Sequence, residues 1–394
     1  MLFPPIDPNG RFRERRDAAR RRRRLRRGTL IGALLACVAV LGVGAKIVGR
    51  GAAEPADVAA GSMTRANVPR GHRSLPVEIR GVHVTMGLVS LPGRLDRYLA
   101  LGRDGLTAIE VDVKDERGQI AFSPGAGSLA SRTGAVRGFY APRRVAREVH
   151  ARGLYLIGRV VVFEDPILAR ARPDLAVRAR DGSVWKDGAG LAWTNPYDRR
   201  VWKYDVDVAV AAARAGFDEI LFDYVRFPSD GNVGATVYAN PSGLGKRAAV
   251  PAFLRYARSR LHPLGVRMSA AVFGLSATRD LGIGQLPARM APFLDEIYPM
   301  TYPSLFGAGE LGLADPSATP GATVTRSLAR FSGALGDQRA LLVPWVQDFT
   351  FTRPYGVDQV QAQIQAARLA GAKGYLLWNA NGVYTNGVLA PDGG

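Results

Sequence analysis

Residues 219–228 read EILFDYVRFP and follow a helical stretch, residues 200–215, that ends at Gly216. A glycine directly after a helix favours a left-handed cap, which ends the helix and lets the chain turn. The first seven residues of the segment are mostly apolar or aromatic, as expected for a strand of a parallel sheet that is covered on both faces. The segment therefore predicts a helix, a tight turn and a buried strand with Asp223 near its carboxyl end.

The same alternation of helical stretches and short β-rich runs continues along residues 76–390, with further helices predicted at 142–152 and 358–370. Eight strands are expected, at residues 79–85, 108–114, 155–163, 219–225, 267–273, 296–301, 341–347 and 375–379. Eight strands joined by helical crossovers predict an α/β fold of the (β/α)8 TIM-barrel type, which has this number of strands. A doubly wound open sheet is the alternative, but no GxGxxG phosphate loop follows the first strand.

The formal charge of +19 is concentrated at the front of the 394-residue chain. Residues 1–50 hold 13 Lys and Arg against 3 Asp and Glu, which accounts for +10 of the total. The remaining excess is diffuse and lacks interleaved aromatic residues, so we expect no nucleic-acid partner. The basic residues within positions 1–50 indicate a membrane-targeting signal instead.

Residues 11–27 are a basic block, and residues 28–48 form an almost uninterrupted apolar run of about 20 residues, the length of a transmembrane helix. We expect a cytoplasmic tail (1–27), a single-pass signal anchor (28–49), a linker (50–75) and an extracytoplasmic barrel in the cell envelope, because basic flanks stay inside. A cleaved signal peptide is one alternative. A lipoprotein signal ending at Cys37 is the other, although the apolar run continues for about ten residues beyond that cysteine.

Cysteine and histidine content limits the chemistry that the chain can support. Cys37 is the single cysteine, so no intrachain disulfide is possible. The four histidines show no HxxxH or HxxH spacing, which disfavours a deacetylase or another metal hydrolase. No metal ion or other cofactor is expected.

The active site of this fold lies at the carboxyl ends of the strands. Side chains alternate between the two faces of a strand, so Val111 and Val113 suit the helix side of residues 108–114. This alternation points Glu110, Asp112 and Lys114 into the barrel.

Asp223 shares a strand face with Leu221 and Val225, inside a run that is otherwise apolar or aromatic until Arg226. A carboxylate in such surroundings is costly unless it has partners or a function. We therefore expect either a catalytic role for Asp223 or a structural ion pair with Arg226 or Arg159.

Polar and aromatic residues near the other strand ends suit a carbohydrate site, because aromatic faces stack on sugar rings and amides and carboxylates bind hydroxyl groups. For Trp193, in the loop after the third strand, and for Met300, packing in the protein interior is the alternative to a sugar contact. The candidate substrate-binding residues are His83, Lys114, Arg159, Trp193, Asn195, Tyr197, Tyr224, Arg226, Met300, Tyr302, Gln347, Trp378 and Asn379.

Six segments together resemble a family of bacterial TIM barrels that was formerly catalogued as a domain of unknown function and is regarded as glycoside hydrolases, distantly similar to α-amylase-like barrels. They occur in the family's order, over about residues 77–384. They are RGVHVT (80–85), VDVKDERG (111–118), WTNPY (193–197), GFDEILFDYVRFPSDG (216–231), EIYPMTYPS (296–304) and GYLLWNA (374–380).

This resemblance implies a TIM barrel and a carbohydrate substrate. It puts Asp223 where amylase-like enzymes hold their nucleophile, and Gln347 and Asp348 where an acidic pair follows the seventh strand. Two features depart from the pattern. The fifth strand ends in residues 271–274, AVFG, without the glutamic general acid, and Leu305 and Phe306 replace a His-Tyr pair.

The sequence therefore predicts a glycoside hydrolase that acts on a cell-envelope or exported polysaccharide. Asp223 is the expected nucleophile or base, and the expected acid is one of Asp112, Asp115, Asp165 and Asp348. The alternative is a catalytically inactive barrel that binds glycan as a membrane-anchored scaffold.

Overall fold

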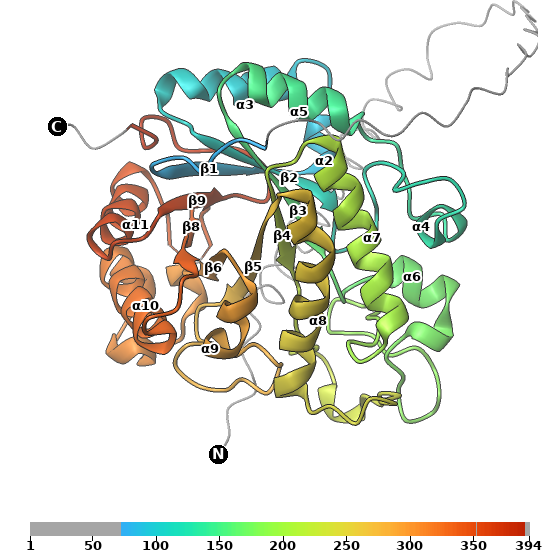
Figure 1. Cartoon of the computed structure of the whole chain (residues 1–394). Coiled ribbons are helices and arrows are strands. Elements are labelled where there is room, and N and C mark those ends of the chain that lie inside the picture. The colour runs from blue at the N-terminus through green and yellow to red at the C-terminus, as the bar shows by residue number, and fades with distance from the viewer. Residues whose placement is uncertain (1–71, 352, 391–394) are drawn as a thin grey trace, which may run out of the picture. The chain divides into compact units, whose positions relative to one another are not determined.

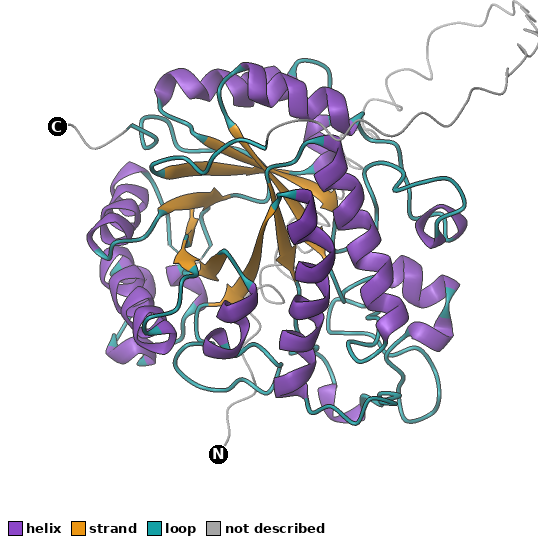
Figure 2. Ribbon diagram, in the orientation of Figure 1, coloured by secondary structure: helices purple, strands orange, loops and turns teal. Residues whose placement is uncertain are grey.

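The computed structural model describes residues 72–351 and 353–390, coloured in Figure 1. Its strands pair in parallel in the order β5-β4-β3-β2-β1-β9-β8-β6-β7, and a further pairing of β5 with β6 closes the sheet into the barrel seen in Figure 2. The strands are β1 (Ile79–Val84), β2 (Ala108–Lys114), β3 (Tyr155–Val161), β4 (Glu219–Asp223), β5 (Arg267–Phe273), β6 (Glu296–Met300), β7 (Leu341–Leu342), β8 (Trp345–Gln347) and β9 (Gly374–Trp378).

The strands β7 and β8 are two parts of one barrel position, because both pair with β6. Pro344 lies between them, and proline has no N–H with which to continue a hydrogen-bond ladder. The nine segments thus make an eight-stranded parallel closed barrel, which confirms the predicted fold.

Helices surround the sheet in Figures 1 and 2, as the predicted crossovers require. Gly216, with a φ of 106°, caps the predicted helix before β4 in the left-handed conformation. The helices are α2 (Met86–Val89), α3 (Arg94–Ala100), α4 (Leu129–Arg132), α5 (Pro142–Ala151), α6 (Pro166–Ala171), α7 (Arg199–Ala215), α8 (Lys246–Leu261), α9 (Pro287–Met290), α10 (Pro320–Leu335) and α11 (Val357–Leu369).

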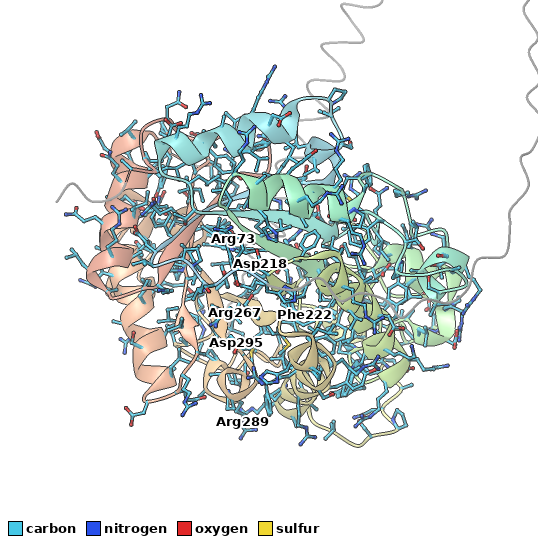
Figure 3. All side chains as sticks on the ribbon, turned by 45° about the horizontal axis from the view of Figure 1, so that its top comes forward. Arg73, Asp218, Phe222, Arg267, Arg289 and Asp295 are labelled. Carbon is cyan, nitrogen blue, oxygen red and sulfur yellow. The ribbon has the colours of Figure 1, made fainter. Side chains whose placement is uncertain are left out.

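Two carboxylates, Asp218 and Asp295, accept hydrogen bonds from backbone N–H groups near the starts of the strands. Asp218, just before β4, accepts from the backbone N–H groups of Leu156 on β3 (2.8 Å) and Arg73 (2.7 Å), beside which it lies in Figure 3. Asp295, just before β6, accepts from the N–H of Met268 on β5 (2.9 Å). Such bonds satisfy backbone groups at the strand starts and help to fix the register.

A C-terminal segment, residues 382–389, takes the place of a helix after β9 within the described part of the chain. Tyr98 of α3 donates a hydrogen bond to the Gly382 carbonyl (2.6 Å), and Tyr375 of β9 donates to that of Val388 (3.2 Å). Val388 and Leu389 are buried. The segment is therefore packed against the barrel, close to the carboxyl end of β1.

No helix within residues 72–351 and 353–390 is long and apolar enough to cross a membrane. The predicted cytoplasmic tail, the signal anchor at 28–49 and the linker up to residue 71 lie outside the described residues.

Candidate active site

Arg159 of β3 joins the two carboxylates that the strand alternation selected. The barrel register pairs it with Asp112 on one side, and its guanidinium donates to Asp112 Oδ1 (2.7 Å). Its Nε and Nη2 atoms both donate to Asp223 Oδ2 (2.9 and 2.7 Å). All three side chains are buried. Asp112 and Asp223 therefore point into the barrel, and the predicted ion pair of Asp223 is formed with Arg159.

The backbone directly after Asp223 is strained. Tyr224 has a φ of 53°, a left-handed value that L-residues other than glycine, asparagine and aspartate rarely adopt. Its N–H donates to the Oδ1 atom of Asp223 (2.7 Å). Backbone strain of this kind persists where the surrounding structure holds it, often at active sites. Here the strained backbone directs the Tyr224 N–H toward Asp223, and this hydrogen bond fixes the second carboxylate oxygen.

His83 of β1 and Glu110 of β2 form a buried pair beside this cluster. The register sets the two residues opposite each other, and Nδ1 of His83 lies 2.6 Å from Oε1 of Glu110. On its other side, Nε2 of His83 lies 3.8 Å from Oδ2 of Asp112. Burial raises the pKa of Glu110, although the neighbouring His83 opposes that shift.

The aromatic rings of Trp378 and Trp345 extend the site toward β8 and β9. Trp378 stacks on His83 with 4.1 Å between ring centroids and on Trp345 with 4.6 Å. The Arg159 guanidinium lies 5.3 Å from the centroid of Trp378. Trp378 is partly exposed, so this predicted sugar contact has accessible surface at the mouth of the barrel.

Asp115 lies in the turn that follows β2, next to Asp112. Its Oδ1 atom accepts from the backbone N–H groups of Arg117 (3.1 Å) and Gln119 (2.8 Å). Burial, and then the negative charges of Glu116 and Asp112, raise the pKa of Asp115 to about 7. A carboxyl group in this state holds its proton near neutral pH and can donate it.

Lys114 does not point into the barrel, so the simple alternation was wrong at the end of β2. A bulge between Asp112 and Lys114 shifts the register, which turns the lysine toward the helix layer. Its Nζ atom there meets Asp205 of α7 (2.6 Å) and Asp165 (2.9 Å). Because it lies in this fully buried cluster, Lys114 is not available as a substrate contact.

Asp165 belongs to the same cluster and is wholly buried. Its Oδ1 atom caps α6 by accepting from the N–H of Leu168 (2.8 Å), and its Oδ2 atom faces Lys114. The structure therefore places this candidate acid in a structural position, between the start of α6 and Lys114.

Asp348 and Asn379 lie at the ends of β8 and β9, where the C-terminal segment holds them. Asp348 accepts from the N–H (2.8 Å) and hydroxyl (2.6 Å) of Thr385, and the amide of Asn379 donates to the Asp348 carbonyl. Burial raises the pKa of Asp348. These two residues stand beside the Arg159 cluster without a direct hydrogen bond to it among the described contacts.

Tyr302, Met300 and Gln347 are buried near the ends of β6 and β8. Burial, and then the charges of Asp223 and Glu110, raise the pKa of Tyr302 well above its usual value. Gln347 instead bonds the loop after β6, accepting from the N–H of Ser304 (3.0 Å) and donating to its hydroxyl (2.8 Å). Gln347 therefore positions that loop.

The end of β5 has no room for the missing glutamic acid. A Cβ atom added to Gly274 would lie 2.5 Å from the Met300 carbonyl oxygen and 2.6 Å from the ring of Phe306. Both contacts are closer than real Cβ atoms show. Because glycine has no Cβ atom, Gly274 allows the end of β5 to pack closely against the end of β6.

The predicted sugar contacts of the loop after β3 are packed away. Trp193 is wholly buried, and its indole N–H donates to Asp187 (3.0 Å). Asn195 donates to the Ala239 carbonyl (2.6 Å), and Tyr197 packs on Phe227. The packing alternative, rather than a sugar platform, therefore describes Trp193.

Arg226 is buried in the same region. Its guanidinium lies within 5.0 Å of the ring centroids of Trp193, Tyr224 and Phe273. Its Nη1 atom donates to the Phe227 carbonyl (3.1 Å) and to the Ser229 hydroxyl (3.1 Å). Arg226 thus connects the loop after β4 to the end of the barrel. Of the two arginines that the sequence offered as ion-pair partners of Asp223, the structure pairs Asp223 with Arg159.

Four residues of the site were not selected from the sequence: Glu110, Glu116, Tyr384 and Thr385. Alternation along β2 did point Glu110 inward, and Glu116 directly follows Asp115, so a local signal existed for both. Tyr384, whose hydroxyl bonds the carbonyl of His83, gave none, because it lies in a segment without periodicity. Among the residues that the structure describes, no group of three or more His, Cys, Asp and Glu side chains could hold a metal ion.

Known structures share this barrel. The glycoside hydrolase domain of PgaB (BpsB) from Bordetella bronchiseptica is 13% identical, with 78% of this chain and 95% of that chain covered and a TM-score of 0.56. The catalytic domain of β-amylase from Paenibacillus polymyxa is also 13% identical, with 81% of this chain and 96% of that chain covered and a TM-score of 0.51. A hypothetical protein from Ruminiclostridium thermocellum is 34% identical over 48% of this chain and 96% of its own, with a TM-score of 0.44.

No curated protein matches this chain. At identities of 13%, the likenesses to the two glycan-acting domains show the fold alone. Residues 81–384 match the family described as "Putative glycosyl hydrolase domain", and because that match spans well over half of the sequence, the chain belongs to this family.

Proposed function

We propose that this chain hydrolyses O-glycosidic bonds of a cell-envelope or exported polysaccharide, with Asp223 as nucleophile or base and Asp115 as general acid. One observation carries the proposal. Arg159 of β3 holds Asp112 of β2 and Asp223 of β4, the two strands on either side of it, and Asp115 follows in the turn after β2. Glycosidic cleavage needs two carboxyl groups in different roles, and the different surroundings of Asp223 and Asp115 support this assignment.

Asp223 suits the role of nucleophile or base because three hydrogen bonds hold its carboxylate in place. Oδ2 accepts two hydrogen bonds from Arg159, and Oδ1 accepts one from the backbone of Tyr224. Hydrogen bonds that are donated to a carboxylate stabilise its charge and fix its orientation. A fixed carboxylate can meet the positive charge that develops on the sugar in the transition state.

Asp115 suits the role of acid better than the other candidates do. Asp112 is held by Arg159, and Asp165 is buried against Lys114. Asp348 accepts two hydrogen bonds from Thr385. Only Asp115 combines partial exposure with a pKa of about 7, and such a group can give its proton to a leaving sugar near neutral pH.

A barrel that binds glycan without cleaving it is the second candidate, and Gly274 favours it. Gly274, directly after β5, is closed to any larger residue by the Met300 carbonyl, and no carboxyl group stands at the end of this strand. Activity therefore depends on an acid from another strand end, which is the part that we assign to Asp115.

We also propose that the barrel acts outside the cytoplasm on a membrane anchor. This rests on the basic block at 11–27 and the apolar run at 28–48. An anchored enzyme of this kind would meet polysaccharide at the envelope, where its reach is set by the linker.

The test is a glycan-array screen of the purified full chain, followed by product analysis and the variant Asp223→Asn. Arg159 keeps Asp112 as a partner in this variant, so we expect a loss of only about 1–2 kcal/mol in stability but a drop of about 10³-fold or more in turnover. Glycan affinity should be retained. The conservative change Asp181→Asn on the exposed loop after β3 is the control.

The outcomes separate the two candidates. A stable Asp223→Asn variant that cleaves at the parental rate would exclude the catalytic role of Asp223. A parent chain that binds glycans but turns over none of them would favour the binding barrel. Early melting with little change in turnover per folded molecule would identify the pair with Arg159 as structural.

A further inference from the structure

The amino end of the barrel, at which the strands begin, lies opposite the mouth and carries exposed arginines on several connections. They stand shortly before β2, β3, β4, β5 and β7, and they are Arg103, Arg152, Arg214, Arg260 and Arg339. Within the described residues, all of them except Arg152 lack an ion pair or a side-chain hydrogen bond. The exposed carboxylates of the same connections are Asp104 and Asp337, so these connections present a net positive charge.

The two most exposed large apolar side chains of the described residues lie at the same end. Val77, which precedes β1, is 94% exposed, and Leu369, the last residue of α11, is 82% exposed. Arg368, next to Leu369, pairs with Glu78, next to Val77 (2.6 Å), and Lys373 donates to the Val77 carbonyl (2.7 Å). The two apolar side chains therefore lie in one region among basic residues, a combination typical of surfaces that contact a bilayer.

The chain also enters the barrel at this end. Nε2 of His72 lies 2.9 Å from the carbonyl oxygen of Leu264, just before β5, and the N–H of Arg73 donates to Asp218, just before β4 (2.7 Å). Figure 3 labels Arg73 and Asp218 here. Only residues 49–71 separate His72 from the apolar run at 28–48. The proposed anchor is therefore joined to the amino end of the barrel.

We propose that the amino end of the barrel lies against a bilayer surface that contains anionic lipid. The inference rests on the membrane anchor proposed above and adds a contact surface to it. Lipid phosphates attract arginines that come within about 10 Å of the bilayer surface, and Val77 and Leu369 can enter the boundary between head groups and acyl chains. An anionic polysaccharide would attract the arginines but leave the two apolar side chains in water, so the combination favours lipid.

This contact sets the direction in which the active site opens. Asp112 and Asp223 lie near the carboxyl ends of β2 and β4, at the end of the barrel opposite the proposed contact surface. A barrel that docks in this way turns its mouth away from the bilayer. It therefore meets polysaccharide that lies beyond the membrane rather than sugars of the lipid head groups.

The test measures how fast single arginines react with a dicarbonyl reagent, read by mass spectrometry. The purified full chain is mixed with lipid nanodiscs of phosphatidylcholine alone or with nanodiscs that also contain phosphatidylglycerol. On the anionic nanodiscs we expect Arg214 and Arg339 to react about fivefold more slowly, the factor that corresponds to the attraction of one arginine to an anionic surface. High salt should remove this protection. Arg170, exposed on α6 near the mouth, should react equally on both lipids.

Variants then locate the surface. The triple variant Arg103→Ser, Arg152→Ser and Arg260→Ser should restore the reaction of Arg214 and Arg339 on anionic nanodiscs to its rate on neutral ones. The matched control removes three exposed arginines from loops at the mouth and should keep the slow reaction. It carries Arg132→Ser, Arg137→Ser and Arg180→Ser.

Equal reaction of Arg214 and Arg339 on the two lipids would overturn the proposal. So would an equal slowing of Arg170, or protection that a folded triple variant retains; if that variant does not fold, protection that persists at high salt decides in the same sense. Anchoring is scored separately, by whether the chain stays with neutral nanodiscs. Protection on anionic lipid without retention on neutral lipid removes only the anchor, whereas retention without protection removes only the contact surface.

Discussion

Asp115 and Asp223 illustrate how the surroundings of a carboxyl group divide the work of acid and base. Asp223 accepts hydrogen bonds from a guanidinium and from a backbone N–H, which hold its carboxylate in place. Asp115 faces Glu116 and Asp112 in a largely buried turn, which favours its proton. In the proposed mechanism the same functional group therefore takes two roles, because one strand end supplies a cation and the turn after β2 supplies further carboxylates.

This assignment predicts the pH dependence of turnover. A general acid must be protonated, and burial together with Glu116 and Asp112 raises the pKa of Asp115 to about 7, so turnover should fall as the pH rises through about 7. Glu116→Gln removes one of the charges that raise this pKa, so the falling limb should move to lower pH. The pH profile of kcat for the parent and the variant provides the measurement.

The control for this prediction is Glu148→Gln, at the surface of α5. It should leave the profile unchanged. A falling limb that stays in place in Glu116→Gln, or that persists in Asp115→Asn with normal activity, would show that another group supplies the proton.

At the scale of elements, the bulge at the end of β2 separates two functions within one strand. Asp112 stays on the barrel side and contacts Arg159, whereas Lys114 turns outward to Asp205 of α7 and to Asp165 at the start of α6. The lysine thereby ties β2 to two helical segments. We infer that this tie holds the turn in which Asp115 lies.

Lys114→Met should therefore destabilise the fold. The change leaves Asp165 and Asp205 buried without their cation, for which a loss of about 3–5 kcal/mol in the free energy of unfolding is expected. Lys203→Met removes a lysine that pairs with Asp207 on the exposed face of α7, and should cost less than about 0.5 kcal/mol. Urea denaturation measures both, and similar values for the two variants would contradict a supporting role for Lys114.

A second element-scale feature is a carboxylate pair near the starts of β4 and β6. Glu219 accepts from the Ser269 hydroxyl (2.5 Å), and Glu296 accepts from Arg267 (2.6 Å), which Figure 3 labels at this end of the barrel. Both glutamates are buried. Burial raises the pKa of each, and their mutual repulsion raises that of Glu296 further.

The raised pKa values predict that stability falls with increasing pH. In the folded chain the pair binds protons more tightly than free glutamates do, so its contribution is fully present below the usual value of 4.5 and is lost as the pH rises through the raised values. Glu296→Gln removes one titrating group, so the free energy of unfolding of this variant should depend less steeply on pH. Urea denaturation across weakly acidic to weakly alkaline pH tests it, and an unchanged slope would contradict the prediction.

At the scale of the whole molecule, the topology can be tested directly. The basic block at 11–27 before an apolar run of about 20 residues predicts that a reporter fused after Gly394 is extracytoplasmic and that the protein stays in the membrane fraction. Replacing the arginines of this block with serine should weaken that orientation. Release of a shortened soluble form would instead show cleavage of the segment.

Much of the fold could be predicted because its signals are local. The eight barrel positions agree with the predicted ranges to within one or two residues, apart from the break at Pro344, since buried parallel strands are short apolar runs bounded by helices. Alternation also pointed Asp112 into the barrel and put Asp223 on one strand face with Leu221 and Val225. The same rule failed at Lys114, because a bulge depends on how two strands pair and leaves no mark in the sequence of one of them.

Side-chain environments beyond the strands could not be predicted in this way. Trp193 and Tyr197 looked like sugar contacts from their residue types, but loop packing against Asp187 and Phe227 buries them. Tyr384 reaches the carbonyl of His83 across 301 residues of sequence, and no pattern near either residue indicates that contact. Burial in a loop is set by the segments that cover it.

The sequence by itself determined the strands, the crossover helices and the carboxylates at the strand ends, because periodicity, helix caps and turn residues act within a few neighbours. The tertiary structure decided which of those carboxylates share a partner and which hold a proton. Arg159 and Asp223 are 64 residues apart and meet only because the strands pair in register, and the pKa of Asp115 depends on burial that the closed barrel creates. Electrostatic interactions depend on distance and solvent exposure, and both are properties of the folded chain.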